Sequence, residues 1–361
     1  MASAVDTLFI PYRNGAIPPI AMPWLFLGAD VPLGGFASEL KQHLKCVTGW
    51  RDQYLSLEAA GLSVAPSLSD DARAQSYGGA FVLLTKHKRE NIDMILRANQ
   101  LVEQGKPIVI AGDKNLGVAS MRKWVGTHHP VVDAIAKNHA TVFWFLAAPA
   151  DASPPAEVST SIQGFVTAPG MFSADKIDAG SAFLAAHITK DISGDIADFG
   201  AGWGYLSKVI IDNAKPRSLA LLEAHWPSLE AAKQNLSDAN VPINFRWIDI
   251  INEQVTQKYD WIIMNPPFHD GRKTDPHLGE RFIEAASNCL KSGGRLLLVA
   301  NSNLPYEAKL ASLFKSVECV QIKNGFKVLK ARRGVTGSQQ VHGGTVTKLL
   351  QTCHTACINS A

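Results

Sequence analysis

Short hydrophobic runs alternate with amphipathic stretches in the first half of the chain. Apolar runs at residues 81–84, 108–111 and 142–145 have strand length and predict buried strands. Between the first two, residues 90–104 carry apolar side chains at helical spacing. Strands that alternate with helices are typical of a parallel sheet covered on both faces. Residues 1–80 are broken by Gly and Pro, and we assign them no function.

The same alternation is clearer in the second half. Its predicted strands are residues 196–199, 218–222, 243–248, 259–264 and 295–300, and its predicted helices are 205–213, 224–237 and 280–290. Gly293-Gly294 is expected to stop the last helix. Asn324-Gly325 lies between two apolar runs and predicts a tight hairpin. We therefore expect an α/β fold whose mostly parallel sheet closes with an antiparallel pair.

A segment rich in Ala, Pro and Ser separates the two halves. We place a first domain at 1–146, a linker at 147–161, a second domain at 162–333, and a poorly ordered tail at 334–361. The strand-loop-helix around Gly112 resembles the one around Gly200 in layout. Two explanations stay open. Either the first half is a duplicated copy whose glycine loop has lost its spacing, or such units simply look alike.

Composition narrows the class of protein. A hydrophobic content of 46% and a charged content of 19% are typical of a soluble globular protein. The balance of 35 Lys+Arg against 32 Asp+Glu is nearly neutral, so any nucleic-acid binding must come from local patches. Two modest basic clusters are present, Lys86-His87-Lys88-Arg89 and a second one formed by Lys323, Lys327, Lys330, Arg332 and Arg333. Each is also consistent with an ordinary solvated surface.

The cysteines and the N-terminus indicate the cellular compartment of the protein. Five scattered cysteines fit a reducing compartment better than a disulfide framework. Cys353 and Cys357 with His354 lack a second ligand pair, so we expect no metal site. Prolines interrupt the N-terminus, which has no basic region typical of a signal peptide. The longest apolar run, 141–150, is far shorter than the ~20 residues of a membrane helix. We expect a cytoplasmic protein without a membrane partner.

A glycine loop follows the first strand of the second half. Asp198-x-Gly200-x-Gly202-x-Gly204 lies between a strand and a helix, and its glycines let a ligand approach the backbone. The spacing differs from the dinucleotide fingerprint, and no basic residue follows as in a P-loop. A tight turn without any ligand remains the alternative interpretation.

Polar residues also close the next three strands. Glu223 ends the second strand, about 20 residues after Gly204, where a carboxylate can meet a ribose diol. Asp249 ends the third strand and can accept a hydrogen bond from an exocyclic amine such as adenine N6. Asn265-Pro266-Pro267-Phe268 ends the fourth. Because the carboxyl ends of parallel strands share one edge of the sheet, we expect these groups to lie along the same edge.

The Asn-Pro-Pro-Phe segment has the groups needed to bind an amine on a flat ring. The prolines bias Asn265 toward an extended conformation. The amide oxygen of Asn265 and the carbonyl of Pro266 can both accept from a planar NH2 group, and Phe268 can stack on the ring. The competing interpretation is a Pro-Pro strand terminator with no ligand.

Longer segments of the second half resemble one enzyme family. A glycine loop, two acids and Asn-Pro-Pro-Phe in this order resemble class I S-adenosylmethionine-dependent methyltransferases that modify exocyclic amines. Further segments resemble the ribosomal RNA guanine-N2 methyltransferases: Pro169-Gly170-Met171-Phe172-Ser173, Asp178-x-Gly180-Ser181, Asn265-Pro266-Pro267-Phe268-His269-Asp270-Gly271, Val299-Ala300-Asn301-x-x-Leu304-Pro305-Tyr306 and Phe326-Lys327-Val328. The resemblance is specific over 165–333 and thinner over 80–145.

The resemblance implies an architecture. It implies two tandem Rossmann-like methyltransferase domains, with a mostly parallel seven-stranded sheet and an antiparallel C-terminal hairpin in the catalytic half. The N-terminal domain of that family is degenerate and would support RNA binding. Gly112-x-x-x-x-Gly117-Val118 with Ser120 resembles the matching part of the degenerate half.

The resemblance also implies roles for residues, with S-adenosylmethionine as the cofactor. The cofactor pocket would be formed by Asp198, Gly200, Gly202, Gly204, Glu223, Asp249 and Asn265. Among these, Glu223 would hold the ribose hydroxyls and Asp249 the adenine. Trp203 is larger than the residue expected within the loop and could alter the fit of the cofactor.

On the substrate side, Asn265 and Pro266 would accept from the guanine 2-amino group, and Phe268 would stack on the base. His269 and Asp270 are the nearest candidates for a base, although methyl transfer requires none. The substrate would be a flipped or single-stranded guanine in ribosomal RNA or in a partly assembled subunit.

Three other functions remain open. Asn-Pro-Pro-aromatic segments also occur in methyltransferases that act on adenine N6 or on a protein glutamine amide, because both present a planar NH2 group. From another class, the chain could be a catalytically silent RNA-binding or assembly protein that keeps the fold.

Overall fold

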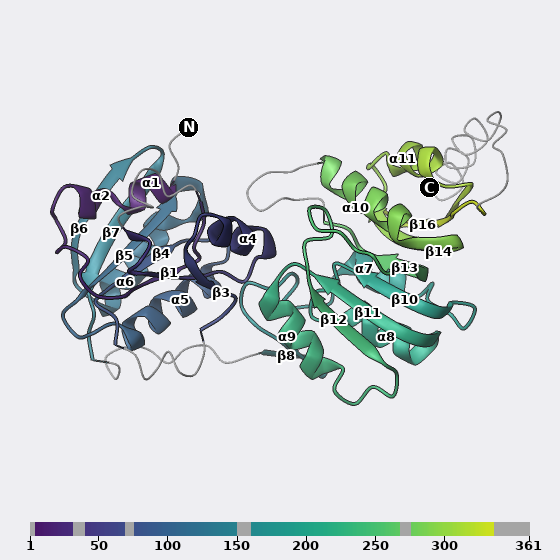
Figure 1. Cartoon of the computed structure of the whole chain (residues 1–361), viewed down its shortest axis with the longest axis horizontal. Coiled ribbons are helices and arrows are strands. Elements are labelled where there is room, and N and C mark those ends of the chain that lie inside the picture. The colour runs from purple at the N-terminus through teal and green to yellow at the C-terminus, as the bar shows by residue number, and fades with distance from the viewer. Residues whose placement is uncertain (1–3, 32–39, 69–75, 150–159, 268–275, 336–361) are drawn as a thin grey trace. The chain divides into compact units, whose positions relative to one another are not determined.

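The computed structural model describes residues 4–31, 40–68, 76–149, 160–267 and 276–335 (Figure 1). They form two compact units: unit 1 is Met1–Ser159 with Ala168–Gly170, and unit 2 is Thr160–Thr167 with Met171–Ala361. The described part of each unit holds its own seven-stranded sheet. The expected tandem Rossmann-like α/β fold is therefore confirmed. The domain limits and the roles expected for the two halves stay predictions.

Unit 2 begins with a small hairpin and continues with alternating strands and helices. Its strands are β8 (Thr160–Ile162), β9 (Phe165–Thr167), β10 (Ser193–Phe199), β11 (Lys215–Glu223), β12 (Ile243–Trp247), β13 (Tyr259–Met264), β14 (Leu290–Asn301), β15 (Ser316–Lys323) and β16 (Phe326–Arg332). Its helices are α7 (Ala179–Ala185), α8 (Tyr205–Asn213), α9 (Trp226–Asn235), α10 (Pro276–Cys289) and α11 (Tyr306–Leu313).

The main sheet of unit 2 has the order β12-β11-β10-β13-β14-β16-β15. The first five strands pair in parallel, and β16 runs antiparallel to both of its neighbours. The chain builds outward from β10 on one side and then crosses to β13 on the other, so the order reverses between these two strands. Open α/β sheets bind ligands outside the carboxyl ends of the strands at such a reversal.

Alternate side chains of the strands enter two separate cores, because successive residues of a strand point to opposite faces. Phe199 and Met264 belong to the core on one face, which also contains Phe282 of α10 and Leu310 of α11. The other core contains residues of α7, α8 and α9. The sheet is therefore covered on both faces, which explains why its central strands are almost continuous apolar runs.

One predicted boundary in unit 2 is wrong. α10 ends at Cys289 and β14 begins at Leu290, so Gly293-Gly294 lies inside a strand rather than behind a helix. The pairing of β13 with β14 shifts at this point, and Gly293 has a φ of +74° that permits the irregularity. The Asn324-Gly325 turn is confirmed, since both residues have positive φ between the paired strands.

Unit 1 also combines a seven-stranded sheet with helices. Its strands are β1 (Trp24–Leu27), β2 (Leu44–Val47), β3 (Ser63–Ala65), β4 (Ala80–Leu83), β5 (Pro107–Asp113), β6 (Val131–Lys137) and β7 (Ala140–Leu146). Its helices are α1 (Ala4–Leu8), α2 (Ile10–Arg13), α4 (Arg51–Ala59), α5 (Lys88–Leu101), the 3-10 helix η3 (Lys114–Leu116) and α6 (Val118–His128). The strand order is β3-β2-β1-β4-β5-β7-β6, which repeats that of unit 2 strand for strand.

This shared order favours a duplicated architecture but not an equivalence of the two loops. Gly112 and Gly117 border the end of β5, whose place in unit 2 is taken by β14. The glycine loop at Gly200 follows β10, whose counterpart is β1, and Gly28 comes directly after β1. Of the two explanations left open for the similar layout around Gly112 and Gly200, the strand order favours the second for these two loops, because any strand-loop-helix looks similar until the pairing of the strands is known.

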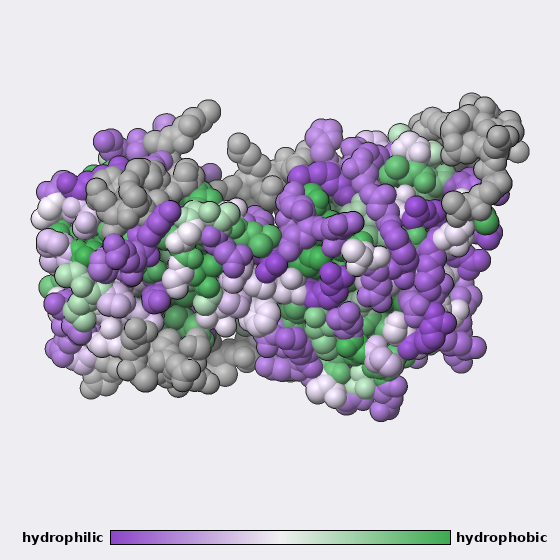
Figure 2. All heavy atoms as spheres, in the orientation of Figure 1, coloured by the Kyte–Doolittle hydropathy of each residue, from purple (hydrophilic) through white to green (hydrophobic). Residues whose placement is uncertain are grey.

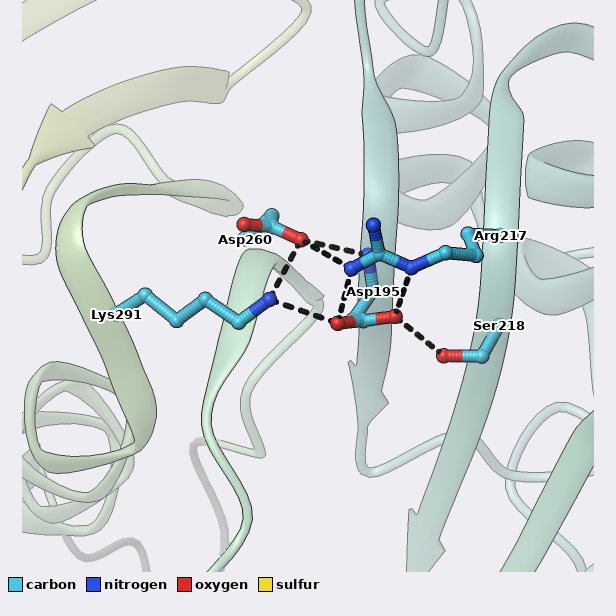
Figure 3. Close-up of polar contacts among 5 residues, drawn as sticks. All are labelled: Asp195, Arg217, Ser218, Asp260 and Lys291. Atoms are coloured by element: carbon cyan, nitrogen blue, oxygen red, sulfur yellow. Dashed lines mark hydrogen bonds and ion pairs between the residues drawn. The ribbon is translucent and has the colours of Figure 1, made fainter.

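A charged cluster links neighbouring strands at the amino-terminal edge of the unit 2 sheet (Figure 3). Asp195 of β10 accepts from Arg217 Nε of β11 at 2.9 Å and from Lys291 Nζ of β14 at 2.7 Å. Asp260 of β13 accepts from the same lysine at 2.9 Å and from the backbone N–H of Asp195 at 2.8 Å. Four neighbouring strands are thus linked by two carboxylates and two cations, which oppose the fraying of this edge.

The cluster makes stability depend on pH. Hydrogen bonds from Arg217 and Lys291 hold the pKa of Asp195 below its usual value. A carboxyl group whose pKa is depressed by folding stabilises the protein above its unfolded pKa, about 4, and loses this contribution as the pH falls. We expect Asp195→Asn to lower the free energy of unfolding by about 1 kcal/mol at pH 7, since the group is partly exposed.

Urea unfolding at pH 7 and at pH 3 measures this difference, which should shrink at the lower pH. Asp212→Asn is the matched control, because its ion pair with Lys208 lies on an exposed helix face. A difference for Asp195→Asn that stayed constant between the two pH values would contradict the assignment.

Candidate active site

The glycine loop at the end of β10 is shaped by left-handed backbone conformations. Gly200, Gly202 and Gly204 have φ values of +70°, +55° and +91°. A side chain on Gly204 would contact Ala232 of α9 at 3.2 Å, so this glycine allows the helices to approach. No heavy atom lies within 4 Å of a Cβ placed on Gly202. The backbone at Gly202 therefore borders open space that any side chain would partly fill.

Asp198 lies beneath this loop and is fully buried. Its Oδ2 accepts from Ser207 Oγ of α8 at 2.7 Å, and its Oδ1 has no hydrogen-bond partner in the described structure. Burial raises the pKa of Asp198 to about 7, against the opposing effect of the Ser207 hydrogen bond. A buried acceptor without a donor is costly in a folded protein, which is typical of a group reserved for a ligand.

Glu223 holds the loop from the neighbouring strand. Its Oε2 accepts from the backbone N–H of Gly202 at 2.7 Å, and its Oε1 accepts from that of His225 at 2.7 Å. Burial raises the pKa of Glu223, while backbone N–H groups of His225, Gly202 and Ala224 oppose the rise. The carboxylate therefore fixes the loop conformation through backbone donors and keeps further acceptor sites.

Asn265 stands at the end of β13, beside the glycine loop. Its Nδ2 donates to Asp178 Oδ2 at 2.9 Å and to Ser181 Oγ at 2.8 Å. Asp178 also accepts from the backbone N–H of Ser181 at 2.8 Å, as the N-cap of α7. Both N–H groups of the Asn265 amide are thus used, and its Oδ1 accepts no hydrogen bond from the described part of the chain.

One pocket of unit 2 brings the glycine loop and Asn265 together. It is lined by Phe172, Ser173, Asp178, Ser181, Gly200, Ala201, Gly202, Trp203, Tyr205, Leu206 and Asn265. No Lys or Arg is among these lining residues, whereas Asp198 and Glu223 lie directly behind the loop. Such a surrounding favours a cationic ligand over a phosphate.

Trp203, whose size could have interfered with the cofactor, has a defined place in the pocket wall. Its Nε1 donates to the Phe172 carbonyl at 3.0 Å, and its ring packs against Phe165 and Tyr205. Asn235 of α9 bonds both the Trp203 carbonyl and the backbone of Val166 in β9. The tryptophan therefore joins the glycine loop to the small hairpin.

Phe172 is the most exposed aromatic residue among those described, at 60%. It lies on the rim of the pocket next to Ser173, which has a φ of +52°. Hydrophilic residues cover most of the visible face of unit 2 in Figure 2. An aromatic ring exposed at a pocket of this kind is a candidate platform for a flat ligand.

The remaining predicted residues differ in what the structure says of them. Asp249 follows β12, and its carboxylate accepts from the Ile251 N–H at 3.0 Å and from Asn252 Nδ2 at 2.6 Å. It is not among the residues that line the pocket. Pro266 is buried beside Asn265. Phe268, His269 and Asp270 lie outside the described residues, as do Cys353, His354 and Cys357.

Comparison with known proteins supports a methyltransferase. The family model "Methyltransferase small domain" matches residues 163–330. Ribosomal RNA small subunit methyltransferase C of Escherichia coli is 30% identical over 255 residues, which cover 68% of this chain and 73% of the relative. The chain belongs to the family of ribosomal RNA small subunit methyltransferase C. The relative from Sodalis glossinidius is 29% identical over 317 residues, covering 82% of this chain and 86% of its own.

A solved structure shares the fold of this chain. The T. thermophilus 16S rRNA N2 G1207 methyltransferase, solved in complex with AdoMet and guanosine, matches with a TM-score of 0.74 and 22% identity, over 91% of each chain. The fold of both units is therefore that of a two-unit ribosomal RNA methyltransferase.

Unit 1 has the same strand order as unit 2 but lacks the residues of the candidate site. Thr48 follows β2 where Glu223 ends β11, and residues 83–86, Leu-Leu-Thr-Lys, stand where β13 continues into Asn-Pro-Pro. A Cβ on Gly28 would meet the Leu83 carbonyl oxygen at 2.6 Å, so the backbone there packs on the neighbouring strand. Open space of the kind found at Gly202 does not exist at Gly28.

One member of the second basic cluster is unavailable for RNA. Lys327 is buried and donates to the Leu304 carbonyl at 2.6 Å and to both Glu307 oxygens at 2.7 and 2.8 Å. This lysine tethers the segment between β14 and α11, so neither a phosphate contact nor a place on the solvated surface, the two interpretations left open for its cluster, holds for Lys327. Lys327 lies between two antiparallel partner strands, and this burial cannot be read from the sequence alone.

Sequence reasoning assigned no role to Asp178 and Ser181, although both lie in a quoted segment. A signal was present for Asp178 alone, because Asp is a favoured residue at the N-cap of a helix. Among the described residues no group of three or more potential metal ligands occurs. No helix found there is long and apolar enough to cross a membrane.

Because the pKa of Asp198 is raised, we expect the stability of the protein to depend on pH. A carboxyl group whose pKa is raised by folding contributes stability at low pH that is lost as the pH rises from about 4 through about 7. Without a ligand, Asp198→Asn should therefore be more stable than the parent at pH 8, by about 1–3 kcal/mol. The advantage should be smaller at pH 5. Urea unfolding at both pH values measures it, and an advantage of equal size at both would contradict the burial of an ionised carboxylate.

Proposed function

We propose that unit 2 transfers a methyl group from S-adenosylmethionine to the 2-amino group of a guanine in small-subunit ribosomal RNA. The observation that carries the proposal is the orientation of Asn265. Both of its N–H groups are bonded within the protein, so its oxygen is left as an acceptor beside the glycine loop. An acceptor in that position suits an NH2 group at the place where a methyl donor would bind.

The residues present fit S-adenosylmethionine. The unpartnered Oδ1 of Asp198 and the open space at Gly202 would serve the methionine part, and Glu223 would hold the ribose hydroxyls. Asp249 would bind the adenine with the acceptor capacity its turn leaves free. The acidic surroundings favour a ligand that carries a positive sulfonium and an ammonium group. When bound, the cofactor supplies an electrophilic methyl group.

The protein's own contribution is to orient the amine. A guanine 2-amino nitrogen is a weak nucleophile because its lone pair is delocalised into the ring. Hydrogen bonds to Asn265 Oδ1 and to the Pro266 carbonyl would favour a more tetrahedral nitrogen and direct its lone pair at the methyl carbon. The N–C bond forms as the methyl–sulfur bond breaks, and the nitrogen then releases one proton. No strong base is required, since the methylated nitrogen is acidic until that proton leaves.

The substrate assignment rests on the relatives and on the chemistry of the pocket. The relatives are named ribosomal RNA small subunit methyltransferases, and the T. thermophilus protein was solved with guanosine. A guanine must leave its base pair to reach such a pocket, so we propose a flipped or single-stranded base, with Phe268 stacking on it. Ribosomal RNA or a partly assembled subunit would be the substrate, in the cytoplasm. Unit 1 would support RNA binding, through clusters such as Lys86-His87-Lys88-Arg89.

The test is methyl transfer from labelled S-adenosylmethionine to ribosomal RNA and to subunits from cells that lack this protein. We expect the label in N2-methylguanosine of small-subunit RNA after nucleoside digestion. Label in N6-methyladenosine would keep the mechanism and overturn the base. Absence of label in RNA with intact cofactor binding would favour a protein glutamine substrate. Absence of cofactor binding would favour a silent RNA-binding protein.

Asn265→Ala should reduce kcat by at least about 100-fold, because the amine loses its orienting acceptor. Cofactor affinity, measured by calorimetry, should stay within about threefold. Asn288→Ala on the exposed side of α10 is the matched control and should behave like the parent. Near-normal turnover of Asn265→Ala would remove the amine-binding role.

Glu223→Ala should weaken cofactor binding by about tenfold or more, because a ribose acceptor and the anchor of the Gly202 N–H are both lost. Glu230→Ala, which removes a partly exposed acid on α9, is its control. Calorimetry with S-adenosylmethionine measures both variants. Unchanged affinity of the Glu223 variant would take Glu223 out of the cofactor site.

A further inference from the structure

Asp178 and Ser181 hold the Asn265 side chain in one of its two amide orientations. An asparagine amide can rotate by 180° and exchange its oxygen for its NH2 group, at little cost in shape. Here the NH2 group faces Asp178 Oδ2 at 2.9 Å and Ser181 Oγ at 2.8 Å. The rotated amide would place Oδ1 against a carboxylate that has no proton to donate. The negative charge of Asp178 therefore excludes the rotated state.

The rotated state would also be inactive. It would present an NH2 group to the NH2 group of the substrate, and two donors cannot bond to each other. Selecting the amide orientation thus decides whether Asn265 attracts or repels the target amine.

The local structure keeps this arrangement rigid. Asp178 is fixed as the N-cap of α7 by the Ser181 N–H at 2.8 Å. Gly180 leaves the space that the arrangement needs, because a Cβ there would approach Asp178 Oδ2 and the Phe326 ring to 3.1 Å each. One helix start therefore sets the positions of both acceptors around the Asn265 amide.

We propose that Asp178 and Ser181 are positioning residues for methyl transfer. The Asp178 carboxylate selects the amide orientation that directs Asn265 Oδ1 toward the amine of the substrate, and Ser181, whose hydroxyl can donate as well as accept, holds that amide in place. This inference rests on the proposed function of Asn265 as the acceptor for the target amine. It predicts a loss in kcat without a matching loss in cofactor affinity.

Three variants separate this role from a structural one. Ser181→Ala removes one acceptor and leaves the N-cap in place. Asp178→Ser keeps an N-cap side chain but is too short to reach Asn265. Ser181→Thr restores the hydroxyl and serves as the rescue variant, and Ser312→Ala, on the exposed face of α11, is the matched control.

We expect Ser181→Ala to lower kcat about tenfold and Asp178→Ser more, with the KM for RNA and the Kd for S-adenosylmethionine within about threefold of the parent. Ser181→Thr and Ser312→Ala should keep parental kcat. An unchanged kcat in both Ser181→Ala and Asp178→Ser would overturn the proposal. So would a loss in cofactor affinity that fully accounts for the lower rate, because the pair would then bind the cofactor directly.

A second readout needs no substrate. In protein labelled with 15N-asparagine, the side-chain NH2 protons of Asn265, assigned by their absence in Asn265→Ala, should exchange slowly with solvent, because both are hydrogen-bonded within the protein. This protection should diminish in Ser181→Ala and Asp178→Ser. A parental protein with slow exchange but no methyl transfer to RNA would contradict the proposed function alone. Fast exchange in the parent would contradict the lock itself.

Discussion

The parallel pairing of β10 with β13 is the constraint on which the candidate active site depends. Phe199 faces Met264 in this register, so the two strands end side by side. The glycine loop and the Asn-Pro-Pro segment, some 60 residues apart in the chain, therefore leave the sheet at the same point. The reversal of strand order between them leaves that point free of a crossing connection, which makes room for a ligand.

Carboxylates serve opposite purposes at the two ends of the unit 2 sheet. At the amino-terminal edge, Asp195 and Asp260 are bonded by Arg217 and Lys291, and their charges are compensated within the protein (Figure 3). At the carboxyl-terminal edge, Asp198 and Glu223 are buried, are bonded to a hydroxyl and to backbone N–H groups, and have raised pKa values. Uncompensated negative charge at low dielectric is unfavourable for the free protein and favourable for a cationic cofactor. The protein thus gives up stability at the candidate site.

Unit 1 has the same fold as unit 2 but lacks the buried carboxylates and the open glycine loop of the candidate site. Its seven strands have the same order, yet Thr48 stands where unit 2 has Glu223, and its first loop packs on the Leu83 carbonyl. Thr48 bonds to Gln53 at 2.5 Å, a local contact that stabilises the turn after β2. The frame depends on buried alternating strands, whereas the site depends on a few loop residues, so one can persist when the other is lost.

Local patterns in the sequence were sufficient for the architecture, and they named the residues of the candidate site, whose roles stay predictions. Strand-length apolar runs and helical spacing are properties of neighbouring residues, and they predicted β13 and α8 at their observed limits. The glycine loop, Glu223 and Asn265 carry their signal in residue type and in their place at strand ends.

The same local signals left open whether the loop at Gly112 is equivalent to the loop at Gly200, because they contain no information about which strands pair. Only the tertiary structure decided that correspondence, the burial of Lys327 against Glu307, and the contact of Asp178 and Ser181 with an asparagine more than 80 residues away. Each of these depends on long-range packing, which brings together side chains whose distance along the chain says nothing about their distance in space.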